Sequence, residues 1–534
     1  MKSPRCGNVC ARKHPSRGNA FPPPRLAFRR AAAFAGALAL LAPLAAFAQS
    51  NATPARITAR IDESRWATLR GNTHPLARGQ YDRGAMAESQ PVHRMLLLLK
   101  RSPEQEAALR SLIDQQQSKG SPNFHQWLTP QQIGREFGPA QADIQTVTGW
   151  LQAQGFQIAR ISAGGTLIEF SGTVGQVLRA FHTQIHRYVV NGREHFANSS
   201  DPQIPAALSP VVAGPVSLHN FGRKAQSRNL GVFKKDLTTG KVVPQFSFGC
   251  LSNSGATVTC NALGPGDFAE IYKVQSLWDS GVDGTGQTIA IVGDSEICTA
   301  TSPDFATTCA GNDDVKKFRS IFGLPTANLP NVIVDGPDPG FNSDEIEGNL
   351  DVQWSGGVAK GATVDFVIAE TTEASAGVDL AAEYIVDNNL APVMSESFGS
   401  CEASLGAGGN AFYSGLWEQA AAQGITVIVS AGDNGSAGCD DQTTETAAGQ
   451  NGVNFGPGVN GIASTIFDVA AGGTDFDITA PAYQTTYWGA ETSDSEGVQH
   501  ISAPMFPRPP GMTPARKTLQ GPQRAAARPP AWRR

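Results

Sequence analysis

The sequence contains no histidine between residues 221 and 499, although the whole chain of 534 residues has nine. A Ser-His-Asp triad cannot be assembled within that stretch, and the usual histidine-based metal sites are excluded there as well. Any acid–base catalysis in this part of the chain must therefore rely on carboxylates.

Basic residues are scarce in the same stretch. Residues 250–500 include 34 acidic and 5 basic residues, a net charge of −29, whereas the rest of the chain carries +24. The two nearly cancel, and the chain as a whole has a formal charge of −5. So acidic a block argues against nucleic acid as its partner. The division predicts a basic N-terminal segment that docks on an acidic domain and leaves when low pH protonates its carboxylates.

A targeting signal is expected at the N-terminus. Residues 31–48 are apolar, follow three arginines and end in a small-x-small pattern before Gln49. This pattern predicts a cleaved secretory signal peptide over residues 1–48, and hence a secreted, extracellular or periplasmic protein. A signal anchor is the alternative, but the run contains Pro43 and is at the short edge of spanning length, so we expect no stable membrane insertion.

Six cysteines remain after the signal peptide, with no C-x-x-C spacing and no nearby histidine, so a zinc site is not expected. An even number in an exported protein favours disulfides, and six cysteines allow about 15 pairings. Closeness in sequence suggests three pairs: Cys250 with Cys260, Cys298 with Cys309, and Cys401 with Cys439.

A polar lead (49–90) precedes a first block over residues 91–219, in which strands and helices alternate. A strand-like run at 95–99 is followed by a helix with a capping-type start at Ser102. Further helices are expected from Thr129, over 141–154 and over 174–181, and strands over 155–162, 166–171 and 182–190. The block predicts a small α+β domain, and the basic residues 220–250 predict an exposed linker that a protease could cut.

The block over residues 251–500 has a different pattern of apolar residues. Short runs rich in Val and Ile occur at 288–293, 332–334, 363–369, 392–397, 425–430 and 466–471, and helical stretches at 345–354, 378–389 and 411–423. Apolar strands that alternate with helices predict a parallel, doubly wound sheet. Functional residues collect at the carboxyl ends of such strands, here after Val292, Ile368, Met394 and Val429.

Two carboxylates stand out in the helix expected after residue 344. Glu347 and Asp351 are four residues apart and would share one face of the helix. Ile346, Leu350 and Trp354 repeat on a neighbouring face and are expected to anchor the helix to the sheet. Two close, partly buried carboxylates separate one another's pKa values and make a general base for low pH. An acidic run of this kind is, by itself, more often a solvated face.

A second signal is Asp433, in the small-residue turn S-A-G-D-N-G directly after the strand expected at 425–430. A turn that uses Asp and Gly for backbone reasons is an equally good interpretation.

Together these motifs resemble the sedolisin family, the kumamolisin-like serine-carboxyl peptidases. SPNFHQWLTPQQIGREFG and HFANSSDPQIP resemble the family's pro-kumamolisin-type activation domain, expected over 91–219 and small, α+β and ferredoxin-like. GTGQTIAIV, EGNLD and SAGDNG follow in family order. The resemblance implies a subtilisin-like sheet, with Glu347 as general base and Asp351 as the carboxylate behind it. It implies that Asp433, protonated, donates to the oxyanion in acid.

The family's nucleophilic Ser lies in a G-T-S-x-x-x-P motif followed by an Asp-rich calcium loop, and neither occurs here. The resemblance thus implies calcium, but its binding loop is absent. Residues 501–534 hold 7 basic residues, no acidic ones and 8 prolines. Related family members carry a segment resembling P-E-T-P-W-N-D-S-C at about this place. If one possible DNA coding of that segment is translated with the reading frame shifted by one nucleotide, it gives P-R-P-P-G-M-T-P-A, which are residues 507–515. We therefore expect a frameshift between residues 487 and 507, a truncated catalytic domain over 251–500 and an out-of-frame tail.

The resulting hypothesis is a secreted, acid-acting endopeptidase precursor, monomeric, with peptide substrates and an intramolecular activation domain; the chain as given should be inactive. The alternative is a non-catalytic secreted protein that binds peptides or another protease. A small-molecule-binding α/β domain is a third possibility, but it predicts a glycine-rich phosphate loop after a strand, which is not seen.

Overall fold

The computed structural model describes residues 53–225, 264–432, 435–439 and 457–474. Beyond these it gives the backbone of three short hairpins: β11 (Phe233–Lys235) with β12 (Val242–Pro244), β13 (Cys250–Leu251) with β14 (Thr257–Val258), and β22 (Thr492–Ser493) with β23 (Gln499–His500). The expected signal peptide, the Cys250–Cys260 pair, Asp433 and the 501–534 tail lie outside the described residues. The described residues all belong to the unit Ala52–Arg534.

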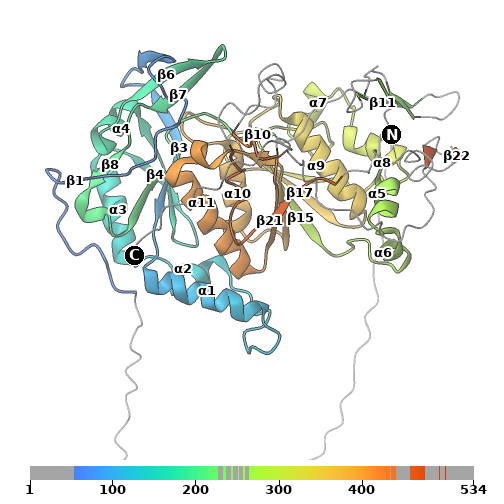
Figure 1. Cartoon of the computed structure of the whole chain (residues 1–534), viewed down its shortest axis with the longest axis horizontal. Coiled ribbons are helices and arrows are strands. Elements are labelled where there is room, and N and C mark those ends of the chain that lie inside the picture. Colours follow the sequence, from blue (N-terminus) through green and yellow to red (C-terminus); the bar gives the residue numbers. More distant parts are fainter. Residues whose placement is uncertain are drawn as a thin grey trace, which may run out of the picture. The chain divides into compact units, whose positions relative to one another are not determined.

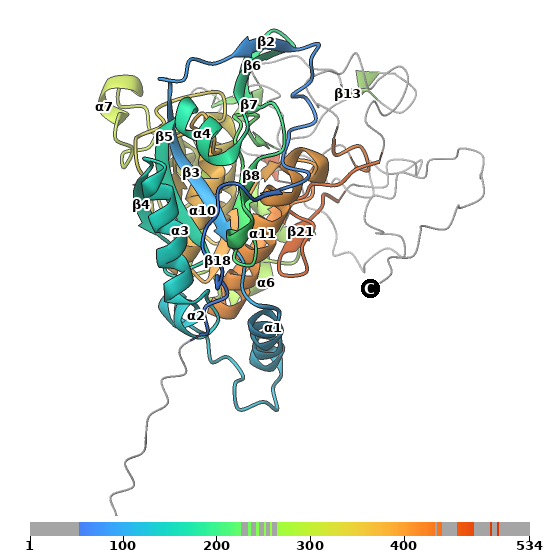
Figure 2. The ribbon, with the colours of Figure 1, turned by 90° about the vertical axis from the view of Figure 1, so that its left-hand side faces the viewer.

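The first block is built around β3 (Pro91–Leu99), in an antiparallel sheet of order β4–β5–β3–β9. Its other strands are β4 (Gln157–Ile161), β5 (Leu167–Thr173) and β9 (Val212–Pro215). α3 (Gln141–Ala153) and α4 (Val174–Phe181) cover one face and lie in front of the strands in Figure 2. Smaller pairings join β1 (Trp66–Thr68) to β8 (Gln203–Pro205), and β2 (Asp82–Ala85) and β7 (Arg193–Asn198) to β6 (Ile185–Val190).

Local sequence explains where three helices of this block begin. Ser102, Thr129 and Thr173 each accept a hydrogen bond from the backbone N–H three residues on, and the glutamine there bonds back to the cap. These are reciprocal capping boxes, which satisfy two otherwise orphaned donors each. They start α1 (Pro103–Gln117), α2 (Pro130–Glu136) and α4, so the start predicted at Ser102 is confirmed.

The second block is a six-stranded sheet of order β16–β17–β15–β18–β20–β21, and every pair in it is parallel, as predicted. In chain order its strands are β15 (Thr288–Gly293), β16 (Asn331–Val334), β17 (Thr363–Ile368), β18 (Val393–Glu396), β20 (Thr426–Ser430) and β21 (Val469–Ala471). The helices are α5 (Pro265–Ile271), α6 (Gln275–Asp279), α7 (Phe305–Thr308), α8 (Asp314–Ile321), α9 (Glu345–Val358), α10 (Gly377–Asp387) and α11 (Glu402–Gln423).

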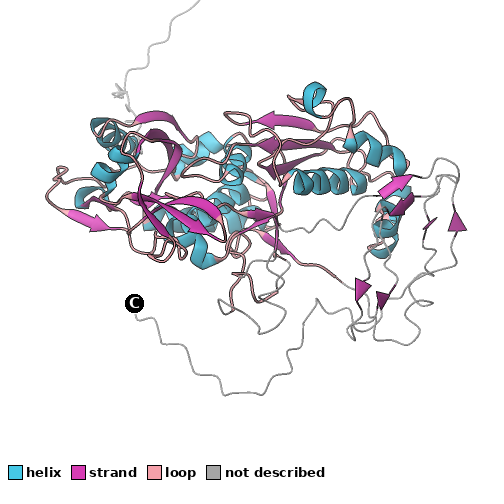
Figure 3. Ribbon diagram, turned by 90° about the horizontal axis from the view of Figure 1, so that it is seen from above, coloured by secondary structure: helices cyan, strands magenta, loops and turns pink. Residues whose placement is uncertain are grey.

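Both faces of this sheet are covered, which explains why its strands are apolar throughout. Ile291 and Phe366 belong to the apolar cluster under α8 and α9, whereas Val292 and Val367 belong to the cluster with α10 and α11. That second cluster also includes Leu96 of the first sheet, so α10 and α11 lie between the two sheets (Figures 1 and 3). The two blocks therefore share one core layer.

One expectation about α9 is wrong. Ile346 and Leu350 are 45% and 40% exposed, so they do not anchor the helix to the sheet. The buried face is instead formed by Glu347, Gly348, Val352, Gly356 and Gly357. A Cβ on Gly348 would lie 2.7 Å from the Phe366 ring. Small residues thus let the helix approach the sheet closely, and the carboxylates turn inward with them.

Within the described part of the chain, the predicted disulfides Cys298–Cys309 and Cys401–Cys439 are both formed. Among the described residues, no helix is long and apolar enough to cross a membrane.

Candidate active site

Polar side chains converge at the carboxyl edge of the parallel sheet. Asp294 directly follows β15, Ser397 directly follows β18, and α9 carries Glu347 and Asp351. The Ser397 Oγ donates a hydrogen bond of 2.8 Å to Asp351 Oδ1. At the edge that the strand pattern indicated, one of the two predicted catalytic carboxylates, Asp351, therefore bonds the residue that follows β18.

Glu347 and Asp351 lie one helical turn apart, and the Glu347 residue is only 2% exposed. Burial, and to a smaller extent the nearby Glu347, raise the pKa of Asp351 to about 8, although the Ser397 hydrogen bond acts to lower it. Asp351 therefore keeps its proton at neutral and acidic pH. A neutral carboxyl group beside Glu347 is the arrangement in which two carboxyls share one negative charge.

Asp294 is a candidate that our sequence reasoning did not name. Burial, and to a smaller extent the neighbouring Asp344, raise the pKa of Asp294 to about 7. The Thr371 hydroxyl lies 3.5 Å from Asp294 Oδ2, and the Asn342 side chain donates to the Asp294 carbonyl at 2.7 Å. The signal that could have identified it is a lone Asp at the first position after an apolar strand.

Asp433 cannot be placed, because it lies outside the described residues. The strand before it, β20, is held at its end by Asn460, whose side chain donates to the Ser430 carbonyl at 2.8 Å. The disulfide from Cys401 to Cys439 fixes the chain a few residues later. These contacts anchor the chain before and after Asp433.

The described residues do not fit the calcium that the family resemblance implies. Only one group of His, Cys, Asp and Glu side chains in the described part has its ligand atoms close together: Cys298, Asp314 and Glu345. Cys298 is bonded to Cys309, and two carboxylates fall short of the six to eight oxygen ligands of Ca²⁺.

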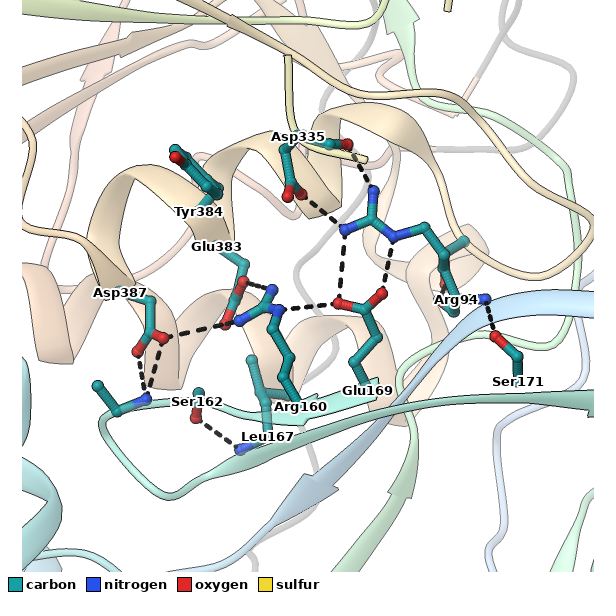
Figure 4. A network of polar contacts seen from close by, with 12 residues as sticks. Arg94, Arg160, Ser162, Leu167, Glu169, Ser171, Asp335, Glu383, Tyr384 and Asp387 are labelled. Carbon is teal, nitrogen blue, oxygen red and sulfur yellow. Dashed lines mark hydrogen bonds and ion pairs between the residues drawn. The ribbon is translucent and has the colours of Figure 1, made fainter. Parts of the chain in front are cut away.

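The first block contacts the second through a chain of ion pairs (Figure 4). Arg94 pairs with Glu169 and with Asp335 of the second block, both at 2.7 Å. Arg160 pairs with Glu169 at 2.9 Å and contacts Glu383 of α10 at 2.8 Å. Arginines of the basic block thus bond acidic groups of the acidic block, as the charge division predicts.

A family model, the pro-kumamolisin activation domain, matches residues 78–221. Xanthomonalisin from Xanthomonas sp. (strain T-22) is 28% identical over 438 residues, which cover 78% of this chain and 49% of that protein. Sedolisin from Pseudomonas sp. (strain 101) is 28% identical over 402 residues, 73% of this chain and 62% of that protein. The chain thus spans about half to less than two thirds of the length of these curated relatives.

A solved structure of Pseudomonas sedolisin, a serine-carboxyl proteinase complexed with two molecules of pseudo-iodotyrostatin, is also similar. Its sequence identity is 24%, over 46% of this chain and 58% of that one, with a TM-score of 0.31. The matched activation domain and the two relatives support a sedolisin-family precursor.

Proposed function

We propose that this chain represents the secreted precursor of a serine-carboxyl endopeptidase that hydrolyses peptide bonds at acidic pH. The observation that carries the proposal is the Glu347–Asp351 pair, turned inward at the carboxyl edge of a parallel sheet in a region without histidine. Glu347 is the general base, and Asp351 behind it is held by Ser397. A buried carboxyl pair supplies a base in acid where an imidazole would be protonated.

Asp433 is proposed to donate a hydrogen bond to the oxyanion from its turn after β20. That role requires a protonated carboxyl group and so favours acidic conditions. The family's nucleophile is a serine that residues 1–534 do not supply in a G-T-S motif, so we expect no acyl-enzyme from the chain as given. We also propose that the protein is exported and monomeric.

The first block is proposed to act as the intramolecular activation domain. The strands of its four-stranded sheet and the helices between them follow in the chain as strand, helix, two strands, helix, strand. In space the strands have the order β9–β3–β5–β4. Both orders support the ferredoxin-like topology expected for this domain. We propose 91–219 as this domain, the linker and processing site in 220–250, and the catalytic domain from 251. The ion pairs of Arg94 and Arg160 support its docking on the second block.

The test begins with sequencing the gene across codons 485–510, where the frameshift is expected, and onward into an intact downstream frame that should contain G-T-S. The chain as given should not cleave denatured protein at about pH 3–5, whereas the chain with the restored frame should. In the restored chain, Glu347→Gln should abolish cleavage, and Glu345→Gln, on the same helix, should not. Cleavage by the chain as given would contradict its expected inactivity. If no serine is encoded downstream, a non-catalytic binding protein becomes the better interpretation.

A further inference from the structure

The expectation of an exposed linker over 220–250 is wrong at its start, because Arg223 is buried and inserts its side chain into the second block. Its Nε and Nη2 donate to Asp379 Oδ1 and Oδ2 at 2.9 and 2.6 Å. The two side chains are 2% and 1% exposed. A bidentate, charge-assisted pair of this kind recognises the planar fork of a guanidinium specifically.

The walls of this pocket belong to the second block. Asp379 lies in α10, Glu396 ends β18 and Tyr413 lies in α11, and none is more than 1% exposed. The Tyr413 hydroxyl is 2.6 Å from Asp379 Oδ1 and 3.2 Å from Glu396 Oε1. Burial and then Asp379 raise the pKa of Glu396 well above its usual range. The pocket thus holds one carboxylate and one neutral carboxyl group, which matches a single guanidinium charge.

The chain around Arg223 lies as a bound peptide would. β10 (Lys224–Ala225) pairs antiparallel with β19 (Phe398–Gly399). Arg223 is buried and Lys224 exposed, the alternation of an extended segment. Extended peptides commonly bind by adding a strand to a sheet edge, with alternate side chains in pockets. β19 begins directly after Ser397, which contacts Asp351, so this short strand runs beside the candidate active site.

We propose that the pocket of Asp379, Glu396 and Tyr413 is a substrate subsite for an arginine side chain, which Arg223 fills until the activation domain leaves. The role as a substrate subsite rests on the proposed peptidase function. The preference for a guanidinium does not, because it follows from the pocket alone. Lysine should bind less well, since an ammonium cannot bond both carboxylate oxygens in the same plane.

The experiment vacates the pocket in the full chain with Arg223→Ala and titrates it with ethylguanidinium at pH 6. The melting temperature should rise saturably, with ethylammonium requiring a roughly tenfold higher concentration. The wild-type chain and Arg223→Ala/Asp379→Asn should not respond. An equal response to both cations, or a response that survives Asp379→Asn, would overturn the proposal.

If Arg223→Ala does not fold alone, its refolding yield is measured with each cation in the buffer. Recovery with ethylguanidinium but not with ethylammonium supports the pocket, and no recovery with either overturns it.

These measurements need no hydrolysis, so they separate the two proposals. The pocket stands without the peptidase function if Arg223→Ala in the frame-restored chain binds ethylguanidinium while the frame-restored chain itself does not cleave protein. If the frame-restored chain cleaves protein with no preference for arginine at one fixed position from the scissile bond, the proposed arginine subsite is wrong and the peptidase function stands.

Discussion

Ser397 donates a 2.8 Å hydrogen bond to Asp351 Oδ1. Two strands and a helix separate the two residues in the sequence. This hydrogen bond favours the charged form of Asp351, whereas burial and Glu347 both favour the neutral form. Ser397 thereby moderates how far the pKa of Asp351 rises.

Removing that hydroxyl should raise the pKa of Asp351 beyond about 8. Carbon-13 NMR titration of the Asp side-chain carboxyls in Ser397→Ala checks this. Ser397→Thr keeps a hydroxyl at the same position and should leave the value close to that of the wild type. An unchanged titration in Ser397→Ala would show that the hydrogen bond has no electrostatic role.

Arg160→Met should destabilise the chain, because it leaves the 1% exposed side chain of Glu383 without its main counter-charge. We expect a loss of about 2–3 kcal/mol in the free energy of unfolding at pH 8, less than for a fully buried pair since Arg160 is 31% exposed. Chemical denaturation measures it. Arg179→Met, which disrupts an exposed pair with Glu88 at 3.8 Å, is the matched control and should change stability by less than about 0.5 kcal/mol.

The cost of Arg160→Met should shrink on acidification. Burial raises the pKa of Glu383 to about 7 in the folded chain, so at pH 5 the carboxyl is neutral and needs no cation. Denaturation repeated at pH 5 and pH 8 tests this. A loss that is equal at both values would mean that Arg160 contributes by packing rather than by charge.

Three histidines surround Phe221: His74 of the polar lead, and His195 and His219 of the first block. His74 and His195 stack on its ring with centroids 4.0 and 4.3 Å away, and His219 lies edge-on at 5.9 Å. Burial lowers the pKa of His74 to about 3 and that of His219 well below its usual value, with Arg223 adding to both shifts. Their contribution to stability is present above pH 6.5 and is lost as the pH falls toward 3.

The carboxyls at the sheet edge behave oppositely. The folded pKa values of Asp294 and Asp351, about 7 and 8, are raised, so their contribution is present below pH 4 and is lost as the pH rises through those values. Between pH 6.5 and pH 4, hydrogen exchange corrected for intrinsic rates should show residues 195–221 losing protection while β15 keeps it. His74→Phe should reduce the loss and the exposed His125→Asn should not; equal loss in both blocks would contradict the expectation.

The two described disulfides should differ in what they contribute. Cys298–Cys309 closes 11 residues and Cys401–Cys439 closes 38. Loop-closure entropy predicts about 3 kcal/mol for the first and about 1 kcal/mol more for the second. Denaturation of the two double Cys→Ser variants compares them. A smaller effect for the longer loop would show that its unfolded state is already compact.

Much of the architecture was predictable because its signals are local. The strand over 288–293 and the helix over 174–181 have the predicted bounds, and Ser102 caps its helix as expected. α8 was missed because its segment DDVKKFRS is mostly charged and shows little apolar periodicity. The face of α9 was misjudged because the buried positions carry Gly348 and Gly356, which a search for apolar periodicity does not register.

By itself, the sequence determined that this chain has no histidine for a triad in its second block, that its strands are parallel and covered on both faces, and that Glu347 and Asp351 share a helical turn. Those features follow from composition and short-range periodicity. Only the tertiary structure decided that Ser397 bonds Asp351, that Asp294 joins the same edge and that Arg223 fills a pocket made by α10, β18 and α11. These contacts join residues far apart in sequence, so only the packing of the two blocks on a shared helical layer could bring them together.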